Sequence, residues 1–131
     1  MANESILVVD DNAQNTRLVS FLLSSRGYAV KSAGSADEAL AALALEVPRL
    51  ILMDLQLPGM DGLTLTRQLK ADPRTRDTFI VAFTAYAMKG DEARAFEAGC
   101  DAYITKPIDT RTLPTKIAEF LAGHSPHREE P

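Results

Sequence analysis

Five short apolar runs, whose starts recur every 20 to 30 residues, constrain the fold of this chain more than any other feature. They occupy residues 6–9, 28–30, 50–53, 79–83 and 102–104. The first, third and fourth runs are continuously hydrophobic and rich in Ile, Val and Leu, as strands that are covered on both faces are. The second and fifth runs are weaker, which predicts positions nearer the edges of a sheet.

The segments between the runs have helical spacing and recognisable ends. Leu18, Phe21 and Leu22 are spaced as one face of a helix, and Gly27 follows as a stop signal. Residues 35–38 (Ser-Ala-Asp-Glu) have the form of a capping box that opens the second helix. We therefore expect two helices, one after each of the first two strands.

Three further helical segments follow the later runs. Leu65 and Leu69 share a face, and Asp72-Pro73 ends that helix. Residues 89–98 contain only Phe96 and alanines as apolar content, so we expect a loosely held helix there. In the last helical segment, three apolar residues lie on one side: Ile117, Phe120 and Leu121.

Strand and helix thus alternate five times along the 131 residues. This order predicts a single α/β domain over residues 1–122, with a parallel sheet, right-handed crossovers and helices on both faces. Pro114 would remove a backbone hydrogen bond from a helix that began at Asp109, so we expect the last helix to begin near Thr112. Residues 123–131 are polar and Pro-containing, which predicts a frayed tail.

Composition excludes several kinds of chemistry. The single cysteine, Cys100, excludes an internal disulfide and a multi-cysteine zinc site. Both histidines, His124 and His127, lie in the last eight residues, so the predicted folded body has no histidine for general-base catalysis. A net charge of −4 and scattered basic residues argue against nucleic-acid binding. With no membrane-length apolar run and no basic leader, we expect a cytoplasmic protein.

Ligands bind open α/β sheets beyond the carboxyl ends of the strands, so the residue after each apolar run indicates the content of the site. Those positions carry carboxylates, a hydroxyl and an ammonium group, on Asp10, Asp11, Asp54, Thr84 and Lys106. The three carboxylates would repel one another unless a cation neutralised them. Oxygen-only ligands predict Mg²⁺ at this edge.

The other two groups suit a phosphoryl group, because Lys106 supplies a positive charge and Thr84 a hydrogen-bond donor. One carboxylate could then act as a nucleophile that forms an acyl phosphate. Asp54 is the candidate, since it follows the middle apolar run and precedes residues 55–59, a loop that ends in a turn signal.

Four segments together resemble the signature set of bacterial response-regulator receiver domains: residues 8–12, 53–62, 84–85 and 106–107. The match extends from residue 5 to about 122, and residues 99–107 resemble the fifth-strand region of stand-alone and hybrid-kinase receivers. The resemblance implies a doubly wound, flavodoxin-like sheet with strand order 2-1-3-4-5.

The resemblance also implies a role for each acidic residue. Asp54 would take a phosphoryl group from a phosphohistidine on a sensor kinase or a histidine phosphotransfer protein. Asp11 and Asp54 would hold Mg²⁺ directly, together with the backbone carbonyl of Gln56. Asp10 would act mostly through water.

The remaining implied roles concern the switch. Lys106 would contact the phosphoryl oxygens, and Thr84 would move to bond one of them. Tyr103 would then turn inward, while Tyr86 occupies a position that tunes dephosphorylation in relatives. The peptide before Pro107 is usually cis in this family.

These features favour a stand-alone phosphorylation-dependent switch or phosphoryl shuttle that assists only its own phosphorylation and hydrolysis. The sequence ends within ten residues of the last helix, so we expect output through protein contacts, including contacts between two copies, rather than through an attached domain. Two alternatives stay open: a haloacid-dehalogenase-type phosphatase, and a receiver that binds partners without phosphorylation. A flavodoxin-like electron carrier is excluded mainly because acidic residues replace a hydroxyl-rich phosphate loop after the first strand. The phosphatases place Asp-x-Asp after the first strand, whereas this chain has the adjacent pair Asp10-Asp11.

Three other candidates favour structural roles. Asp61 is expected to cap the third helix, and Cys100 to be a small buried residue. The spacing of His124 and His127 is compatible with a metal, but a mobile tail argues against that role.

Overall fold

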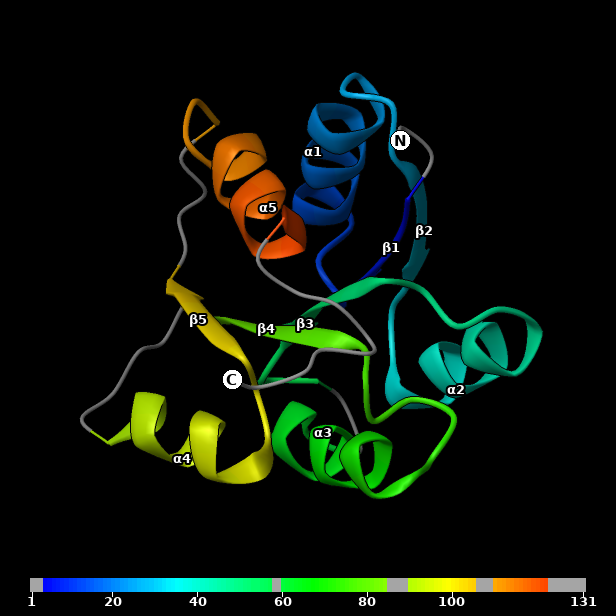
Figure 1. Ribbon diagram of the computed structural model, residues 1–131, viewed down its shortest axis with the longest axis vertical. Helices are drawn as coiled ribbons and strands as arrows, with labels where there is room; N and C mark the ends of the chain where they lie inside the picture. The colour runs from blue at the N-terminus through cyan, green and yellow to red at the C-terminus, as the bar shows by residue number, and fades with distance from the viewer. Residues whose placement is uncertain (1–3, 58–59, 85–89, 106–109, 123–131) are drawn as a thin grey trace.

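A computed structural model of the chain describes residues 4–57, 60–84, 90–105 and 110–122. Strands and helices alternate throughout these residues, as expected (Figure 1). The strands are β1 (Ser5–Val9), β2 (Ala29–Ala33), β3 (Leu50–Asp54), β4 (Phe79–Thr84) and β5 (Ala102–Thr105). The helices are α1 (Ala13–Ser24), α2 (Ala36–Leu45), α3 (Gly62–Ala71), α4 (Asp91–Ala98) and α5 (Leu113–Ala122). The expected tail, residues 123–131, lies outside the described residues.

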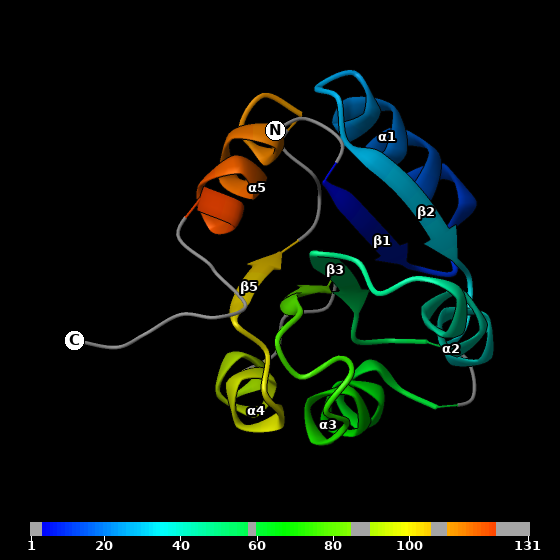
Figure 2. The ribbon, with the colours of Figure 1, turned by 45° about the vertical axis from the view of Figure 1, so that its right-hand side comes forward.

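All the strand pairs are parallel, and the sheet has the order β2-β1-β3-β4-β5. This order confirms the fold that the family resemblance implied. The weaker apolar runs form the two edge strands, β2 and β5, whereas every residue of the central strand β3 is buried. Figure 2 shows β2 and β5 at the edges of the sheet, where the weaker runs were expected.

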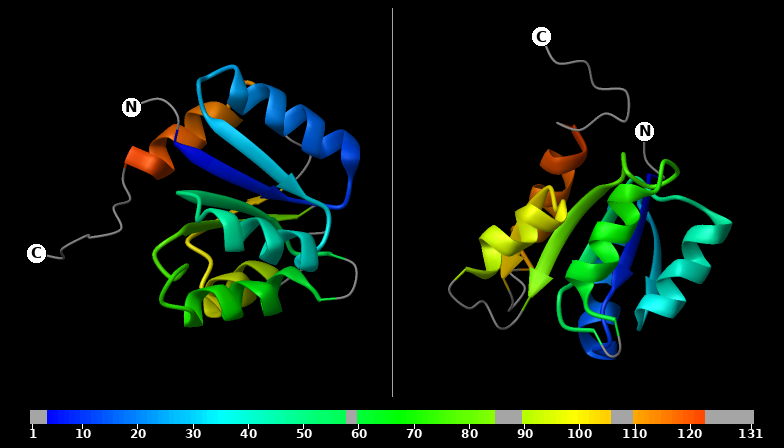
Figure 3. Two further views of the ribbon diagram at one scale, coloured as in Figure 1. Left: turned by 90° about the vertical axis from the view of Figure 1, so that its right-hand side faces the viewer. Right: turned by 90° about the horizontal axis from the view of Figure 1, so that it is seen from below.

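Two hydrophobic clusters fill the two faces of the sheet. Helices α1 and α5 cover one face, and α2, α3 and α4 cover the other (Figure 3). Alternate residues of each strand face opposite clusters, so Ile6 and Val8 pack beneath α1 and α5 while Leu7 and Val9 pack beneath α2 and α3. No helix in the described ranges is long and apolar enough to cross a bilayer.

The helix starts follow the expected capping chemistry. The hydroxyl of Ser35 accepts a hydrogen bond from the Glu38 N–H at 3.2 Å, which confirms the predicted cap of α2. The Glu38 carboxylate accepts from the Gly34 N–H at 2.6 Å, one residue earlier than in a standard capping box. Asp61 caps α3 as expected, since its Oδ1 accepts from the Thr64 N–H at 2.8 Å.

The last helix begins at Leu113, which places Pro114 in its first turn, as expected. At that position the ring displaces no hydrogen bond within the helix. The Pro114 side chain is also buried, so it contributes apolar contact as well as a fixed backbone angle.

The buried face of α1 differs from the one that the spacing predicted. Val19 and Leu23 are fully buried, whereas Leu18 is 39% exposed and Phe21 is 70% exposed. Apolar residues occupy most of the circumference of α1, so two faces have acceptable helical spacing. Packing against the sheet buries the face that contains Val19 and Leu23, which spacing alone does not reveal.

Candidate functional site

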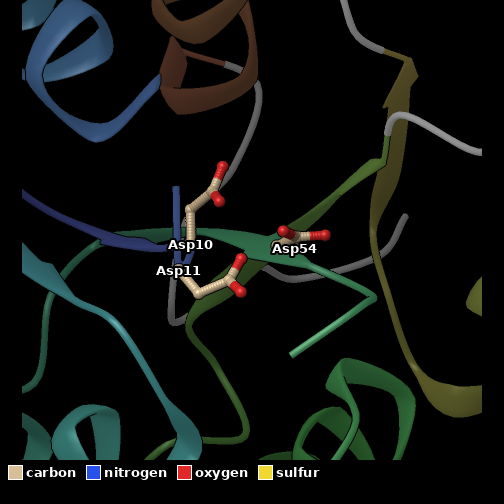
Figure 4. A group of neighbouring side chains, drawn as sticks. All are labelled: Asp10, Asp11 and Asp54. Atoms are coloured by element: carbon tan, nitrogen blue, oxygen red, sulfur yellow. The ribbon is translucent and has the colours of Figure 1, made fainter. Parts of the chain in front are cut away.

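The ends of β1 and β3 bring three carboxylates together, as the sequence predicted (Figure 4). Val9 of β1 pairs with Met53 of β3, so the residues that follow them, Asp10 and Asp54, leave the sheet side by side. One carboxylate oxygen from each of Asp10, Asp11 and Asp54 lies within 4.8 Å of the others. Residues more than forty positions apart in the chain therefore form one acidic centre.

The three carboxylates differ in their access to solvent. Asp10 is 3% exposed and Asp54 is 5% exposed, whereas Asp11 is exposed at the rim. A cleft of about 460 Å³ opens beside Asp10 and Asp11 and is also lined by Arg17, Ser20 and Ser32. This cleft reaches the two carboxylates that follow β1, whereas Asp54 is not among the residues that line it.

Backbone amides hold the two buried carboxylates in place. The Asn12 N–H donates to Asp10 Oδ1 at 2.9 Å, and the Gln56 N–H donates to Asp54 Oδ1 at 3.0 Å. In each case the donor is two residues further along the chain, so a tight turn orients the side chain locally. The orientation of both carboxylates is therefore set by the fold before any ligand arrives.

Asn12 contributes more than sequence analysis assigned to it. Its side-chain oxygen accepts from the Asn15 N–H at 3.0 Å and caps α1. Its own N–H holds Asp10, so the helix start and the acidic centre share one residue. The preference of asparagine for N-cap positions is the signal that would have indicated this role.

The donor set fits the predicted metal. One oxygen from each of three carboxylates, two of them buried, lies close to the others, and a bound cation would offset their mutual repulsion. All three offer oxygen, which hard divalent cations such as Mg²⁺ prefer, and the exposed side of Asp11 leaves room for water. The described residues thus supply ligands for one such ion.

Thr84 lies at the same edge of the sheet, as the sequence predicted. It is the last residue of β4 and is 1% exposed. Asp54 pairs with Phe83, so Thr84 lies one position beyond the partner of the central carboxylate. Thr84 also pairs with Thr105, the residue before Lys106. Lys106 itself lies outside the described residues, as do Pro107 and Tyr86.

Tyr103 is half-buried in β5, where it pairs with Ala82 and packs against the cluster beneath α3 and α4. Burial raises the pKa of its phenol above the usual value, and the negative charges of Asp91 and Glu92 raise that pKa further. The Arg94 guanidinium opposes this effect, so the charged groups of α4 act on the phenol with both signs.

Comparison with known proteins agrees with this geometry. The profile of the response regulator receiver domain matches residues 6–118. The chain belongs to that family. The polar-differentiation response regulator DivK of Brucella ovis is 42% identical to it over 118 residues, which cover 90% of this receiver and 96% of that protein.

Two solved structures resemble the receiver across almost its whole length. A CheY-like receiver domain protein from Methanospirillum hungatei has a TM-score of 0.86 and 33% identity, covering 93% of this chain and 96% of its own. The receiver domain of the sensor histidine kinase PA1611 from Pseudomonas aeruginosa has a TM-score of 0.83 and 31% identity, covering 92% and 99%. That structure is described with a magnesium ion coordinated in the active-site cleft.

Proposed function

We propose that this receiver accepts a phosphoryl group on Asp54 from a phosphohistidine and passes the signal on through protein contacts. The observation that carries the proposal is the placement of the buried Asp54 carboxylate at the end of β3, within 4.8 Å of oxygens from Asp10 and Asp11. Family membership and the likeness to DivK support a phosphoacceptor role in signalling.

The transfer is a displacement at phosphorus. A carboxylate oxygen of Asp54 forms the new bond to phosphorus while the bond from phosphorus to the histidine nitrogen breaks, and its electron pair leaves with the imidazole. The Gln56 N–H holds Oδ1 of Asp54, so little reorientation is needed. Thr84 and Lys106 are the proposed donors to the phosphoryl oxygens, because Thr84 ends β4 and Lys106 is the next residue in the sequence after β5.

Asp11, Asp54 and the backbone carbonyl of Gln56 would hold Mg²⁺ directly, with Asp10 acting through water. The magnesium described for the PA1611 receiver supports this assignment. The bound ion would offset negative charge on the entering phosphoryl group and on the carboxylates around it.

We further propose a cytoplasmic setting and a sensor histidine kinase or a histidine phosphotransfer protein as the phosphoryl donor. Self-association is one route by which the signal would be passed on.

The experiment compares labelling by acetyl phosphate with Mg²⁺ in the native protein, Asp54→Asn and Asp37→Asn, with intact-protein mass as the readout. Asp37 is an exposed carboxylate in the first turn of α2, so its replacement is a matched control. We expect labelling of the native protein and of Asp37→Asn, and none of a correctly folded Asp54→Asn. Undiminished labelling of Asp54→Asn would show that the acceptor is elsewhere.

A further inference from the structure

The first residue of α3, Gly62, lies directly against the backbone of the proposed acceptor. A Cβ at this position would be 2.3 Å from the carbonyl oxygen of Asp54 and 2.8 Å from the Cα of Leu55. Both neighbours are backbone atoms of the chain leaving β3, which cannot rotate away as the tip of a side chain can. The lack of space for a Cβ is therefore what requires glycine at position 62.

Backbone conformation gives no such requirement. The described glycines with a positive φ are Gly27, Gly90 and Gly99, so Gly62 has a conformation that other residues adopt. An alanine at position 62 would also be compatible with a helix start. The close contact with Asp54 and Leu55 is thus the feature that a side chain would disturb.

A hydrogen bond closes the same junction. The Gly62 N–H donates to the carbonyl of Leu55 at 3.1 Å. This hydrogen bond joins the start of α3 to the residue that follows Asp54. The next residue, Gln56, donates its N–H to Asp54 Oδ1 at 3.0 Å. Contact, hydrogen bond and carboxylate orientation thus depend on the same three consecutive residues, 54–56.

We infer that Gly62 is a positioning residue for phosphoryl acceptance. Its lack of a side chain allows α3 to fix the backbone of residues 54–56. The Asp54 carboxylate and the Gln56 carbonyl would then be placed to bind the same Mg²⁺ ion. This inference rests on the proposed function. It means that the position of α3 determines how the Mg²⁺ ligands of residues 54–56 are arranged.

The displacement that a methyl group would cause is large for a metal site. Relief of a 2.3 Å contact requires the backbone at Asp54 and Leu55 to move by roughly 1 Å relative to α3. Mg²⁺ demands near-ideal octahedral geometry, and a misplacement of about 1 Å can reduce a reaction rate about 100-fold. We expect Gly62→Ala to raise the Mg²⁺ dissociation constant about tenfold or more, with slower labelling as a consequence.

Two control variants separate positioning from general destabilisation. Gly34→Ala is the matched glycine control, because a Cβ there would meet only the flexible Glu38 carboxylate, at 3.4 Å. Ile117→Ala removes a fully buried side chain from α5, in the cluster on the other face of the sheet, and so lowers stability away from residues 54–56. Urea unfolding ranks the stability of all the variants.

The measurement is a Mg²⁺ titration followed by amide resonances in ¹⁵N-labelled protein, with acetyl phosphate labelling as a second readout. We expect native dissociation constants for Gly34→Ala and Ile117→Ala, and a raised constant for Gly62→Ala even if Ile117→Ala is the less stable protein. A native constant in Gly62→Ala overturns the inference and leaves the proposed function intact. No Mg²⁺ response in the native protein refutes the proposed function, and the inference with it.

A measurement on the native protein covers the case in which Gly62→Ala does not fold. If the hydrogen bond from the Gly62 N–H to the Leu55 carbonyl supports Mg²⁺ binding, then Mg²⁺ binding must stabilise that hydrogen bond, because the coupling free energy is reciprocal. Saturating Mg²⁺ should slow hydrogen exchange of the Gly62 amide several-fold more than that of the Thr64 amide, which bonds to Asp61. Equal effects on both amides would contradict the inference.

Discussion

The ammonium group of Lys70 lies 2.9 Å from Oδ2 of Asp101, joining the end of α3 to the turn before β5. The same ammonium group donates to the carbonyls of Arg76 and Thr78, and Asp101 Oδ2 also accepts from the Ile80 N–H. The pair therefore connects α3 to the segment before β4, to β4 itself and to the turn before β5. A Cβ at Gly99 would lie 2.7 Å from Cγ of Lys70, so the turn also closes over the lysine stem.

Replacement of this lysine should destabilise the fold. Lys70→Met keeps the apolar stem but leaves two carbonyls and the Asp101 carboxylate without their shared donor, so we expect the free energy of unfolding to fall by about 1 to 2 kcal/mol. Urea unfolding measures the change. Lys31→Met is the control, because the Lys31–Glu46 pair is 57% and 52% exposed and should contribute little. Equal effects of the two variants would contradict the role assigned to Lys70.

The acidic centre gives a second prediction, on metal binding. Asp11 is the exposed member of the three carboxylates, so Asp11→Ala should leave the fold intact and relieve some charge repulsion without metal. Mg²⁺ should raise the melting temperature of the native protein, since a ligand of the folded state stabilises it, and raise that of Asp11→Ala much less. Labelling by acetyl phosphate should slow both in Asp11→Ala and in native protein treated with a chelator. Rapid labelling in excess chelator would exclude the metal role.

The sequence predicted the parts of this site that depend on sheet topology. Apolar runs located the strands, and the rule for ligand sites in parallel sheets then placed Asp10, Asp54 and Thr84 at one edge. The ends of three strands had to meet for this to hold, and their meeting follows from the parallel strand order alone. Packing density did not need to be known.

Features that depend on close approach were not predictable in the same way. Nothing in the sequence distinguishes a glycine that makes space, such as Gly62, from a glycine that forms a turn. The buried face of α1 was misassigned because Leu18 and Phe21 have as good a spacing as Val19 and Leu23. Both cases depend on how a helix sits on the sheet, which is a tertiary relationship.

The buried cysteine gives a prediction on pH. Burial raises the pKa of the Cys100 thiol from 9.0 to about 11, opposed by the Thr66 hydroxyl at 3.9 Å from Sγ. The thiol of the unfolded chain ionises first, so the folded state loses relative stability as pH rises from about 9 to about 11. We expect this group to contribute a loss of about 2 to 3 kcal/mol over that range.

Urea unfolding of native protein and Cys100→Ala at a series of pH values isolates the contribution of the thiol. The gap in unfolding free energy between the two proteins should be constant below about pH 8, where the thiol is protonated in both states, and should shift against the native protein at higher pH. A gap that does not change with pH would mean that the thiol ionises alike in the folded and unfolded chains. Alkylation of Cys100 at neutral pH should also be far slower in the folded protein than in urea.

The last prediction concerns transmission of the signal from Asp54. A phosphoryl group adds negative oxygens that need donors, and Thr84 lies at the adjacent strand end. Movement of Thr84 toward that group would empty volume beside β5, where Tyr103 is the neighbouring large side chain. Tyr103 packs against the hydrophobic cluster that also contains Ala95 of α4, so we expect its movement to reach that helix.

Thr84→Ala should therefore accept phosphate but transmit it poorly. The measurement compares amide resonances with and without beryllofluoride, and we expect the changes at Tyr103 and along residues 91–98 to be much reduced in this variant. Thr105→Ala is the matched control, since Thr105 pairs with Thr84 across β4 and β5 but is exposed. A two-state shift of a few kcal/mol is within reach of charge-assisted hydrogen bonds, so loss of one donor should weaken it measurably. The full native response in Thr84→Ala would separate Tyr103 from the phosphoryl site and require another route to α4.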